Sequence, residues 1–348
     1  METLNLNVLA ITPLSVGIVN GGGRTQSFQT IKHLKRIGVH VDLFNPWNPV
    51  NPDEYDIVHL FLAGNETLSA ARKFSECKAK LVVSPVFFTQ RGESSIKAAL
   101  RFEKLFKPVV RGVFTDYGIK SKICRYADAI LPNTKAEARL IENGFGIDSS
   151  KINVIPNGVD LRFKEAKPDY FFQKYGLKNF ALFAGDASAP RKNIWRLIKA
   201  FQNIDHHLVI LGSFRSDSYS RDCIKLAELN DRILLLNTVQ NDDPLLESAY
   251  AAADTFILPS LFETPGIAAL EAALAGCKIA ITRVGGTTEY FGDEAFYLDP
   301  LSIPSIQKAV RSALESKHSN ALRNYIIKNF SWQNVAGQTL LAYKKLFK

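Results

Sequence analysis

The sequence predicts an α/β protein made of two doubly wound parallel sheets. Its 348 residues exceed one ordinary hydrophobic core and suit two domains. Short β-branched apolar runs alternate with longer segments of helical spacing. These runs are apolar throughout, as in parallel strands covered on both faces by helices. Each half of the chain contains about six such runs, which indicates one doubly wound domain per half.

The expected strands share this short apolar composition. They are 8–12, 39–44, 57–61, 80–83, 129–131 and 153–155 in the first half, and 180–183, 208–211, 233–236, 255–258, 278–281 and 295–298 in the second. Segments such as 27–37 and 195–201 have helical spacing. The opening METLNLNVLAIT lacks a basic leader, so we interpret it as a first strand and not as a secretory signal.

Domain boundaries follow from a loss of periodicity. The stretch GVDLRFKEAKPD, 158–169, gains charge and has no apolar repeat. We expect one doubly wound domain at 1–160, a second at 161–330, and a final amphipathic helix within 331–348. Ligands of open α/β sheets bind beyond the carboxyl ends of the strands. Two such domains facing each other would therefore enclose the ligand in a cleft.

The net charge indicates acidic binding partners but does not identify which kind. The net charge is +9 and the pI is about 9.2, which favours nucleic acid, anionic lipid or phosphorylated substrates. No nucleic-acid-binding motif is recognisable. None of the four cysteines lies in a CxxC pair or matches a zinc spacing. We therefore expect reduced thiols and a cytoplasmic protein.

The segment PSLFETPGIAALEAALAG, 259–276, is the most specific part of the sequence. A strand ends at Pro259, and we expect a helix with Thr264 as N-cap and Pro265 as its first residue. Gly276 is a natural end for this helix. Backbone amides at a helix start have no intrahelical partner and form an anion site with the macrodipole. The amides in question are those of Gly266, Ile267 and Ala268.

Two glutamates accompany this helix start. Glu271 lies on the same helical face as Ile267 and could accept hydrogen bonds from the vicinal hydroxyls of a ribose. Glu263, nearer the amides, could hold the hydroxyls of a second sugar. The alternative is that Glu271 only decorates a helix and Glu263 is a loop charge. The alanines around Glu271 predict a crowded, partly buried acid that needs partners, which favours a functional role.

Two further loops follow predicted strands. In FAGDASAPRKN, 183–193, Arg191 and Lys192 open a helix and would suit a diphosphate. A solvated basic helix start is the alternative, although cations there oppose the dipole. In NGGGR, 20–24, amides can approach a ligand closely. Gln26 stands where a dinucleotide-binding GxGxxG needs its third glycine, which disfavours an oxidoreductase.

These motifs together resemble the retaining glycosyltransferases of family 4, which have the GT-B fold. The resemblance covers nearly the whole chain. It is carried by GGGRTQSFQTIKHLKRIGVHVDLF, LPNTKAEARLIENGFGIDSSKINVIPNGVD, FAGDASAPRKN, LPSLFETPGIAALEAALAGCKIAITRVGGTTEY and FSWQNVAGQTLLAYKKLF. The resemblance implies a GT-B fold, in which two Rossmann-like domains face each other across a cleft. Residues 1–160 would be the acceptor-side domain, 161–330 the nucleotide-sugar-binding domain, and 331–348 a helix that packs back on the first domain.

Matching positions imply roles. Lys192, helped by Arg191, would neutralise the donor diphosphate, and Glu263 would bind hydroxyls of the transferred sugar. Glu271 would hold the nucleotide ribose. The remaining donor-binding positions are backbone contacts, at Gly22, Gly23, Gly212, Thr264, Pro265, Gly266 and Ile267.

Three positions depart from the family pattern. Asp186 stands where many relatives have arginine, and Arg191 could supply that charge. The matching segment VVSPVFFTQRG, 82–92, lacks the usual histidine, so His59 is the remaining cleft histidine; a structural role is the favoured alternative for it. Gly212 belongs to Leu-Gly-Ser-Phe and not to the common GxG, so we give it less weight.

The implied reaction transfers a hexose-type sugar from a nucleotide-diphosphate donor to a glycan or lipid-linked acceptor. Retention of configuration follows from the resemblance alone. No Asp-x-Asp motif is present, so we expect no metal and no cofactor, with cations and helix amides stabilising the leaving group. A GT-B epimerase and a non-catalytic nucleotide-sugar-binding protein remain alternatives.

The basic stretch 97–125 includes Phe102, Leu105 and Phe106. It could meet an anionic membrane, which would add a peripheral location at the inner membrane face. A solvated helix face with buried aromatic side chains is an equally favoured alternative.

Overall fold

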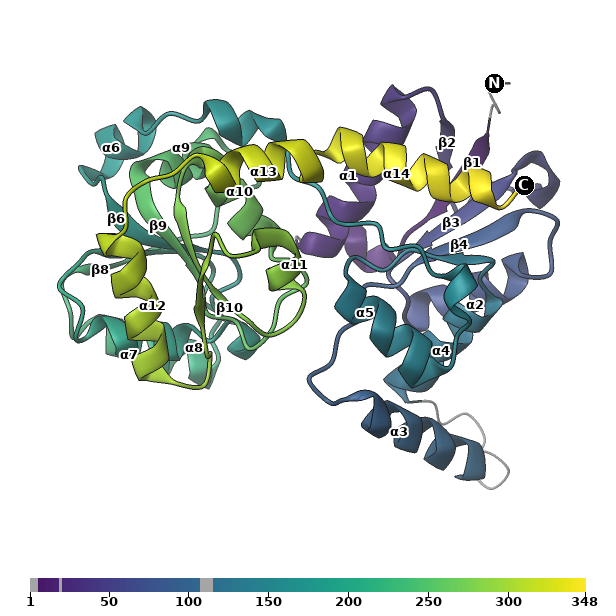
Figure 1. The fold of residues 1–348 in the computed structure, drawn as a ribbon, viewed down its shortest axis with the longest axis horizontal. Helices are drawn as coiled ribbons and strands as arrows, with labels where there is room; N and C mark the ends of the chain where they lie inside the picture. The colour runs from purple at the N-terminus through teal and green to yellow at the C-terminus, as the bar shows by residue number, and fades with distance from the viewer. Residues whose placement is uncertain (1–5, 19–20, 107–114) are drawn as a thin grey trace. The chain divides into compact units, whose positions relative to one another are not determined.

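The computed structural model describes residues 6–18, 21–106 and 115–348, and it divides into two compact units (Figure 1). Unit 1 comprises Met1–Gly158 together with Trp332–Lys348, and unit 2 comprises Val159–Ser331. The boundaries expected at 160 and 330 lie close to these divisions. Residues 1–5 of the predicted N-terminal segment, Asn20 of the glycine loop, and 107–114 of the basic stretch lie outside the described residues.

Unit 1 contains a parallel five-stranded sheet in the order β2-β1-β3-β4-β5. Its strands are β1 (Asn7–Ile11), β2 (His40–Leu43), β3 (Ile57–Phe61), β4 (Lys80–Ser84) and β5 (Ala129–Ile130). Its helices are α1 (Gly22–Arg36), α2 (Asn65–Phe74), α3 (Glu93–Phe106), α4 (Asp116–Tyr126), α5 (Lys135–Arg139) and α14 (Trp332–Lys345). β1, β3, β4 and β5 are buried on both faces, as their continuous apolar composition predicted, whereas the edge strand β2 exposes His40 and Leu43.

Helices cover both faces of this sheet. α1 and α14 pack together on one face, while α2 and α4 pack together on the other (Figure 1). The final helix therefore returns to the first domain, as predicted. Gly158 permits this return, because a Cβ there would lie 2.6 Å from Cδ2 of Trp332 and 2.9 Å from its Cα.

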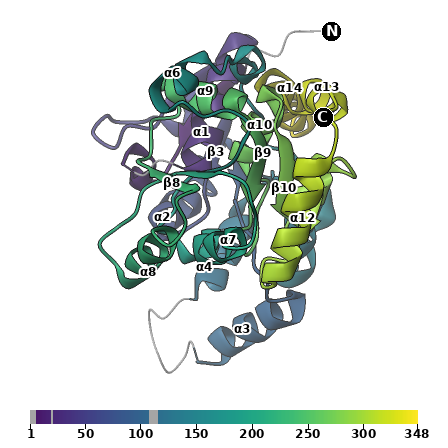
Figure 2. The same ribbon diagram turned by 90° about the vertical axis from the view of Figure 1, so that its left-hand side faces the viewer.

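Unit 2 contains a parallel six-stranded sheet in the order β11-β10-β9-β6-β7-β8. Its strands are β6 (Phe180–Ala184), β7 (Leu208–Leu211), β8 (Ile233–Leu236), β9 (Ala253–Leu258), β10 (Lys278–Thr282) and β11 (Phe296–Leu298). Its helices are α6 (Asp169–Tyr175), α7 (Ile194–Phe201), α8 (Ser218–Ala227), α9 (Pro244–Ala252), α10 (Ile267–Ala275), α11 (Thr287–Phe291), α12 (Ile303–Glu315) and α13 (Ala321–Phe330). Figure 2 views the molecule turned by 90° and shows α7, α8 and α12 together on one side of this sheet.

One predicted strand, 153–155, is wrong. This segment makes only an isolated bridge, Ile152 to Ile130, and then single hydrogen bonds such as Ile155 N to Pro132 O. The neighbouring β5 has just two residues, and Pro132 and Pro156 cannot donate ladder hydrogen bonds, so a longer pairing cannot form.

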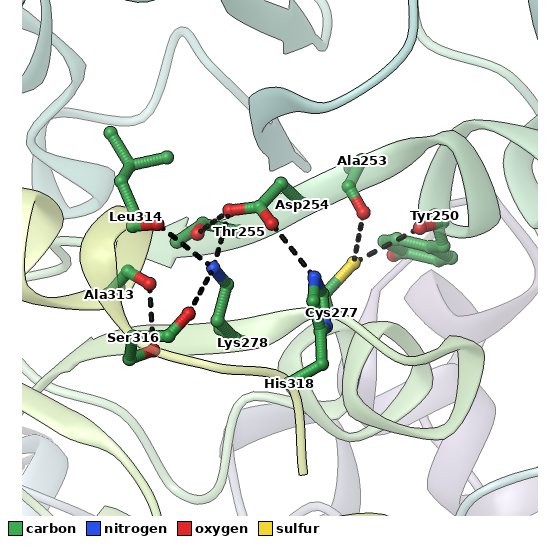
Figure 3. Close-up of polar contacts among 10 residues, drawn as sticks. All are labelled: Tyr250, Ala253, Asp254, Thr255, Cys277, Lys278, Ala313, Leu314, Ser316 and His318. Carbon is green, nitrogen blue, oxygen red and sulfur yellow. Dashed lines mark hydrogen bonds and ion pairs between the residues drawn. The ribbon is translucent and has the colours of Figure 1, made fainter.

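A polar cluster stabilises the amino ends of β9 and β10 (Figure 3). The Lys278 ammonium is nearly buried and lies 3.0 Å from Asp254 Oδ2. It also donates to the carbonyl oxygens of Leu314, at 3.2 Å, and Ser316, at 3.1 Å. All three protons of Lys278 therefore have acceptors. The cluster joins the end of α12 to the sheet and has the character of a structural anchor.

The four cysteines are free thiols, and three of them are buried. Among the helices that the structure describes, none is both long enough and apolar enough to cross a bilayer.

Candidate functional site

The strand order of unit 2 places a topological switch point between β6 and β9. From β6 the chain proceeds outward to β7 and β8, then crosses back to β9 and continues to β10 and β11 on the other side. Loops leaving the carboxyl ends of β6 and β9 therefore lead in opposite directions, and open α/β sheets bind their ligands at such a point. The loops that the sequence singled out, 185–193 and 259–266, are these two.

Backbone and side-chain hydrogen bonds tie the two loops together. Leu261 N donates to Arg191 O at 2.8 Å. The buried Asn193 adopts a left-handed conformation, with φ of 61°, and its Nδ2 donates to Pro259 O at 3.0 Å. A second bond from the same Nδ2 reaches Pro300 O at 2.7 Å. These contacts fix the side chains that follow β6 against those that follow β9.

The result is a compact charge cluster. Lys192 Nζ donates to Glu263 Oε1 at 2.6 Å. Arg191 Nη1 donates to the same oxygen at 3.3 Å and to Phe262 O at 3.1 Å. Two cations thus face one carboxylate, which leaves a surplus positive charge at the switch point. Such a surplus favours a polyanionic ligand.

Glu263 is ionised in this environment. Burial alone would raise the pKa of its carboxyl group, but the charges of Lys192 and Arg191 outweigh burial and hold that pKa below its ordinary value. Only 8% of the Glu263 side chain is exposed, whereas 41% of the Arg191 side chain is. An incoming anion can therefore reach the guanidinium without displacing the carboxylate.

The helix after β9 begins later than the sequence suggested. Thr264 is not its N-cap and Pro265 is not its first residue; α10 starts at Ile267 with Gly266 as N-cap. Gly266 has φ of 87°, which is incompatible with a right-handed helical residue, so the helix can begin only after it. The Thr264–Pro265 peptide bond is cis. Gly276 ends the helix with φ of 107°, as expected.

The start of α10 has backbone amides ahead of its first helical hydrogen bonds; that they bind an anion stays a prediction. Gly266 O accepts the amides of Ala269 and Leu270, so helical pairing starts there. The preceding amides belong to the first turn, which has no intrahelical acceptors, and they lie in the segment that carries Glu263. Cations from the β6 loop and the amino end of α10 consequently flank the same glutamate.

The loop after β10 holds the backbone of Glu263. Glu263 N donates to Val284 O at 3.1 Å, and Gly286 N donates to Glu263 O at 2.9 Å. Gly285, with φ of 109°, approaches so closely that a Cβ on it would lie 2.1 Å from Glu263 O. Three loops, after β6, β9 and β10, therefore determine where this one carboxylate lies.

Glu271 has a separate set of partners. It is 5% exposed, which confirms the expectation of a buried acid. Its Oε1 accepts from Asn241 Nδ2 at 3.0 Å and its Oε2 from the Tyr250 hydroxyl at 3.2 Å. Burial raises the pKa of Glu271 to about 7, against the opposing effect of these hydrogen bonds and of Arg162.

Asp186 finds its cation in Arg215 and not in Arg191. Asp186 Oδ2 accepts from Arg215 Nη2 at 2.9 Å, and Oδ1 accepts from Ser188 N at 3.1 Å. Arg215 follows β7, so its side chain comes from the loop next to that of β6. Gly212 allows these loops to touch, because a Cβ on it would lie 2.3 Å from Gly185 O. In unit 2, therefore, Gly212 has a packing role.

Gly22 and Gly23 open α1 at the switch point of unit 1, between β1 and β3. A Cβ on Gly23 would lie 2.7 Å from Cδ2 of Leu62, the residue that follows β3 and that has φ of 61°. The glycine is needed for this close approach of loop and helix. The expectation that Gly22 and Gly23 also contact a donor stays a prediction.

His59 is placed as a structural residue of unit 1. It is 1% exposed, and its Nδ1 lies 2.6 Å from the Tyr343 hydroxyl while its Nε2 lies 2.9 Å from Ser84 Oγ. Burial lowers the pKa of His59 to about 3, so the ring is neutral. The histidine connects β3, β4 and α14.

The sequence did not single out four residues of unit 2 that hold the site loops, Asp186 or Glu271 in place. They are Asn193, Arg215, Asn241 and Tyr250. Arg215 could have been identified from the sequence, because it is a cation just after β7, the strand next to β6. The others act through hydrogen bonds between loops distant in sequence. No group of three or more His, Cys, Asp or Glu side chains gathers as a metal site within 6–18, 21–106 and 115–348.

The comparisons with known proteins agree with this geometry. Residues 169–330 match the model of the glycosyl transferases group 1, and residues 20–163 match that of glycosyltransferase family 4. The O-antigen chain mannosyltransferase B of Escherichia coli is 31% identical over 187 residues, which are 50% of this chain and 48% of that protein. The MMP alpha-(1->4)-mannosyltransferase of Mycolicibacterium hassiacum is 24% identical over 251 residues, 69% of this chain and 59% of that protein.

The chain thus spans about half the length of the curated relatives it matches. Among solved structures, Anabaena HepE in complex with UDP and glucose superposes with a TM-score of 0.69 at 16% identity, covering 98% of this chain and 100% of that one. At this identity the likeness concerns the fold, which is the GT-B arrangement of two Rossmann-like domains.

Proposed function

Because the chain belongs to glycosyltransferase family 4, we propose that it transfers a hexose-type sugar from a nucleoside-diphosphate donor to a glycan or lipid-linked acceptor. The observation that carries this proposal is the Lys192–Glu263 contact of 2.6 Å at the switch point of unit 2. Two named relatives are mannosyltransferases, and one structural neighbour was solved with UDP and glucose. These names support a hexose and a nucleoside diphosphate as ligands.

The charge arrangement suits the departure of a diphosphate. As the glycosyl–phosphate bond breaks, negative charge grows on the leaving group, and fixed cations and helix amides stabilise it. Lys192 and Arg191 would bind the diphosphate, assisted by the amides of Gly266 and Ile267 at the start of α10. The surplus of one cation over the Glu263 carboxylate supports this binding, because one positive charge remains for the diphosphate while Glu263 keeps a cationic partner.

Glu263 would orient hydroxyls of the transferred sugar. It is ionised and lies between two loops, so its outer lone pairs can accept hydroxyl hydrogen bonds. A nucleophilic role is disfavoured, because its Oε1 already bears two cationic donors. Retention of configuration rests on family membership, and NMR of the product anomer tests it. A product with inverted anomeric configuration would contradict a retaining mechanism.

The proposed transfer does not need a metal ion. This metal independence is supported by the cation cluster, which can supply the charge that a divalent ion supplies in other transferases. Turnover should persist in excess EDTA. Loss of turnover in EDTA, with recovery on adding Mg²⁺ or Mn²⁺, would show that a metal takes part.

A thermal-shift screen against UDP-, GDP- and ADP-sugars is the primary test. A ligand that binds the native state raises its apparent stability, and a ligand at about a hundredfold above its Kd adds about 2.7 kcal/mol. The bound donor is then incubated with glycan and lipid-linked acceptors. Transfer supports the proposal; release of a free or epimerised sugar supports a GT-B epimerase, and binding without turnover supports a binding protein.

We further propose a peripheral contact with anionic membrane through α3. On this helix Phe102, Leu105 and Phe106 are exposed at 59%, 74% and 48%, which overturns the alternative of buried aromatic side chains. They form one stripe at helical spacing, beside exposed Lys97, Arg101 and Lys104. Apolar and cationic stripes side by side are typical of interfacial helices.

Flotation with vesicles of phosphatidylglycerol tests this contact. Wild-type protein should float, and Leu105→Ser combined with Arg101→Glu and Lys104→Glu should not. Reversing Lys174 and Lys178 on unit 2 instead changes the net charge by a similar amount without touching α3, and should leave flotation intact. Absence of flotation by the wild type would contradict a membrane contact through α3.

A further inference from the structure

Glu271 is held from both sides by neutral donors. Its Oε1 accepts from Asn241 Nδ2 at 3.0 Å, and its Oε2 accepts from the Tyr250 hydroxyl at 3.2 Å. A carboxylate oxygen has two lone pairs, so each oxygen keeps one for another donor. The two donors leave the carboxylate with a single orientation and with two remaining acceptor positions side by side.

Arg162 determines which way the Asn241 amide points. The guanidinium can only donate, and its Nη2 donates to Asn241 Oδ1 at 3.1 Å and also to Asn241 O. Oδ1 must therefore face Arg162, which leaves Nδ2 to face Glu271. Arg162 is itself fixed by Glu247, whose Oε1 accepts from Nη1 at 2.7 Å. Arg162 thus donates to Glu247 on one side and to Asn241 on the other, and Asn241 in turn donates to Glu271.

Tyr250 is an equally rigid support. It is 1% exposed in the last turn of α9, and its ring makes T-shaped contacts with Phe163 and Phe256 at centroid distances of 5.6 and 5.7 Å. Its carbonyl oxygen accepts from Cys277 Sγ at 3.0 Å, a contact shown in Figure 3. Burial and Glu271 raise the pKa of Tyr250 well above its ordinary value, so its hydroxyl stays protonated and donates.

The charged groups around Glu271 come from several elements. Asp160, before the 3-10 turn that contains Arg162, raises the pKa of Glu271, while Arg162 lowers it. Glu247 on α9 neutralises Arg162. On α13, which also packs against α10, Arg323 donates to Lys164 O. Burial is the largest influence, and the donors from Asn241 and Tyr250 are the main opposition to it.

We propose that Asn241 and Tyr250 are positioning residues that hold the Glu271 carboxylate for the hydroxyl groups of the donor's nucleoside. The inference rests on the proposed function, since it assumes that a nucleoside diphosphate binds unit 2. Neither residue need touch the reacting atoms. Each residue favours the ionised form of the Glu271 carboxyl group and fixes its orientation. The ionised form is the one that accepts hydrogen bonds from both vicinal hydroxyls.

The experiment measures the Kd of UDP, GDP and ADP by calorimetry on the full chain from about pH 6 to about pH 9. Wild-type affinity should rise as pH increases through about 7, where Glu271 loses its proton, and then level off. In Tyr250→Phe and in Asn241→Ala a donor to the carboxylate is lost, so its pKa rises. At pH 7 the first unit of rise should weaken binding about fivefold, because the ionised fraction of Glu271 falls from about one half to about one tenth, and affinity should recover near the upper end of the range.

Two controls separate this role from general damage. Tyr343→Phe removes an equally buried hydroxyl that binds His59 in unit 1, and should leave the pH profile unchanged. Glu271→Gln cannot titrate, so its profile reports only the ligand's own phosphate ionisation. Adding Tyr250→Phe to Glu271→Gln should cause little further loss. Asn241 is exposed, so its alanine variant remains informative if Tyr250→Phe does not fold.

The outcomes distinguish the inference from the proposed function. A shifted midpoint in both variants, absent from the Tyr343→Phe protein, supports the positioning role. Binding that weakens equally at all pH values, or does not weaken, overturns it while leaving the proposed function intact. If none of the three nucleotides binds wild-type protein at any pH, the proposed function fails, and the inference fails with it.

Discussion

Lys192 and Glu263 are separated by 71 residues in the chain, yet their side chains meet at 2.6 Å across the switch point between β6 and β9. The lysine belongs to the loop after β6 and the glutamate to the loop after β9. Because these strands are neighbours in the sheet, both loops leave from the same edge. The pairing combines the cation that would meet a diphosphate with the carboxylate that would meet the sugar.

Lys192→Ala should reduce turnover by about 10²–10³, the effect of removing one preorganised donor to a developing negative charge. The buried Glu263 would retain Arg191 as its cation, so the fold should persist. Lys199→Ala is the matched control, because this exposed lysine of α7 lies near the Trp195 ring and away from the cluster. Steady-state kinetics with the donor found in the screen provide the measurement. Turnover of Lys192→Ala close to that of the control would exclude a leaving-group role.

Gly285→Ala should lower activity much more than Gly276→Ala, although both glycines have nearly the same positive φ. Their φ values are 109° and 107°, so both variants carry similar backbone strain. Only at Gly285 would the new Cβ also meet Glu263 O, at 2.1 Å; at Gly276 nothing lies within 4 Å. Strain alone costs about 1–3 kcal/mol of stability in each variant.

The two glycine variants are compared by urea unfolding and by kcat/KM. Similar losses of stability together with a loss of kcat/KM confined to Gly285→Ala would show that the loop after β10 positions Glu263. Equal kinetic losses in both variants would mean that general destabilisation explains the effect.

Much of the fold could be predicted from the sequence because parallel strands have a simple signature. Residues 57–61, 208–211 and 233–236 are strands with the predicted bounds, since each is a short apolar run between polar turns. The failure at 153–155 has the same origin. That run is apolar and β-branched, but its neighbour is too short to pair with it, and pairing partners are not visible in local composition.

Only some residues of the candidate site could be predicted from the sequence. Glu263, Lys192 and the start of α10 carry local signals: charges and glycine directly after strands. Asn241 and Tyr250 lie 30 and 21 residues before Glu271 and have no distinguishing local pattern. The helix start was placed too early because Thr-Pro is a common helix opening, and a left-handed Gly266 cannot be read from the letters alone.

His59 predicts a pH dependence of stability in unit 1. Its pKa is about 3 in the folded protein and about 6.5 in an unfolded chain, so the unfolded state binds more protons between these values. Stability should therefore be fully present above about pH 6.5 and should fall as pH decreases, by up to about 1.4 kcal/mol per pH unit. Glu271, with its raised pKa, has the opposite sign, because its contribution is lost as pH rises towards 7.

The difference between wild type and His59→Asn isolates this term from that of Glu271. Urea unfolding at a series of pH values should give a smaller slope for the variant between about pH 4 and about pH 6. Equal slopes would mean that His59 is protonated in the folded protein, contrary to its burial between Tyr343 and Ser84.

Lys278→Met should destabilise unit 2 by about 3 kcal/mol, because removing one member of a buried ion pair leaves the other charge without its partner. Asp254, with 15% of its side chain exposed, would keep only the His318 contact of 2.9 Å and the Thr255 hydroxyl. Adding Asp254→Asn should recover part of the loss, since no buried charge then remains. Donor affinity should stay unchanged in both proteins, because the cluster in Figure 3 lies at the amino ends of the strands and the candidate site at their carboxyl ends. Calorimetric unfolding combined with donor titration makes the comparison, and a parallel loss of affinity would show that the anchor at one end of the sheet controls the geometry at the other.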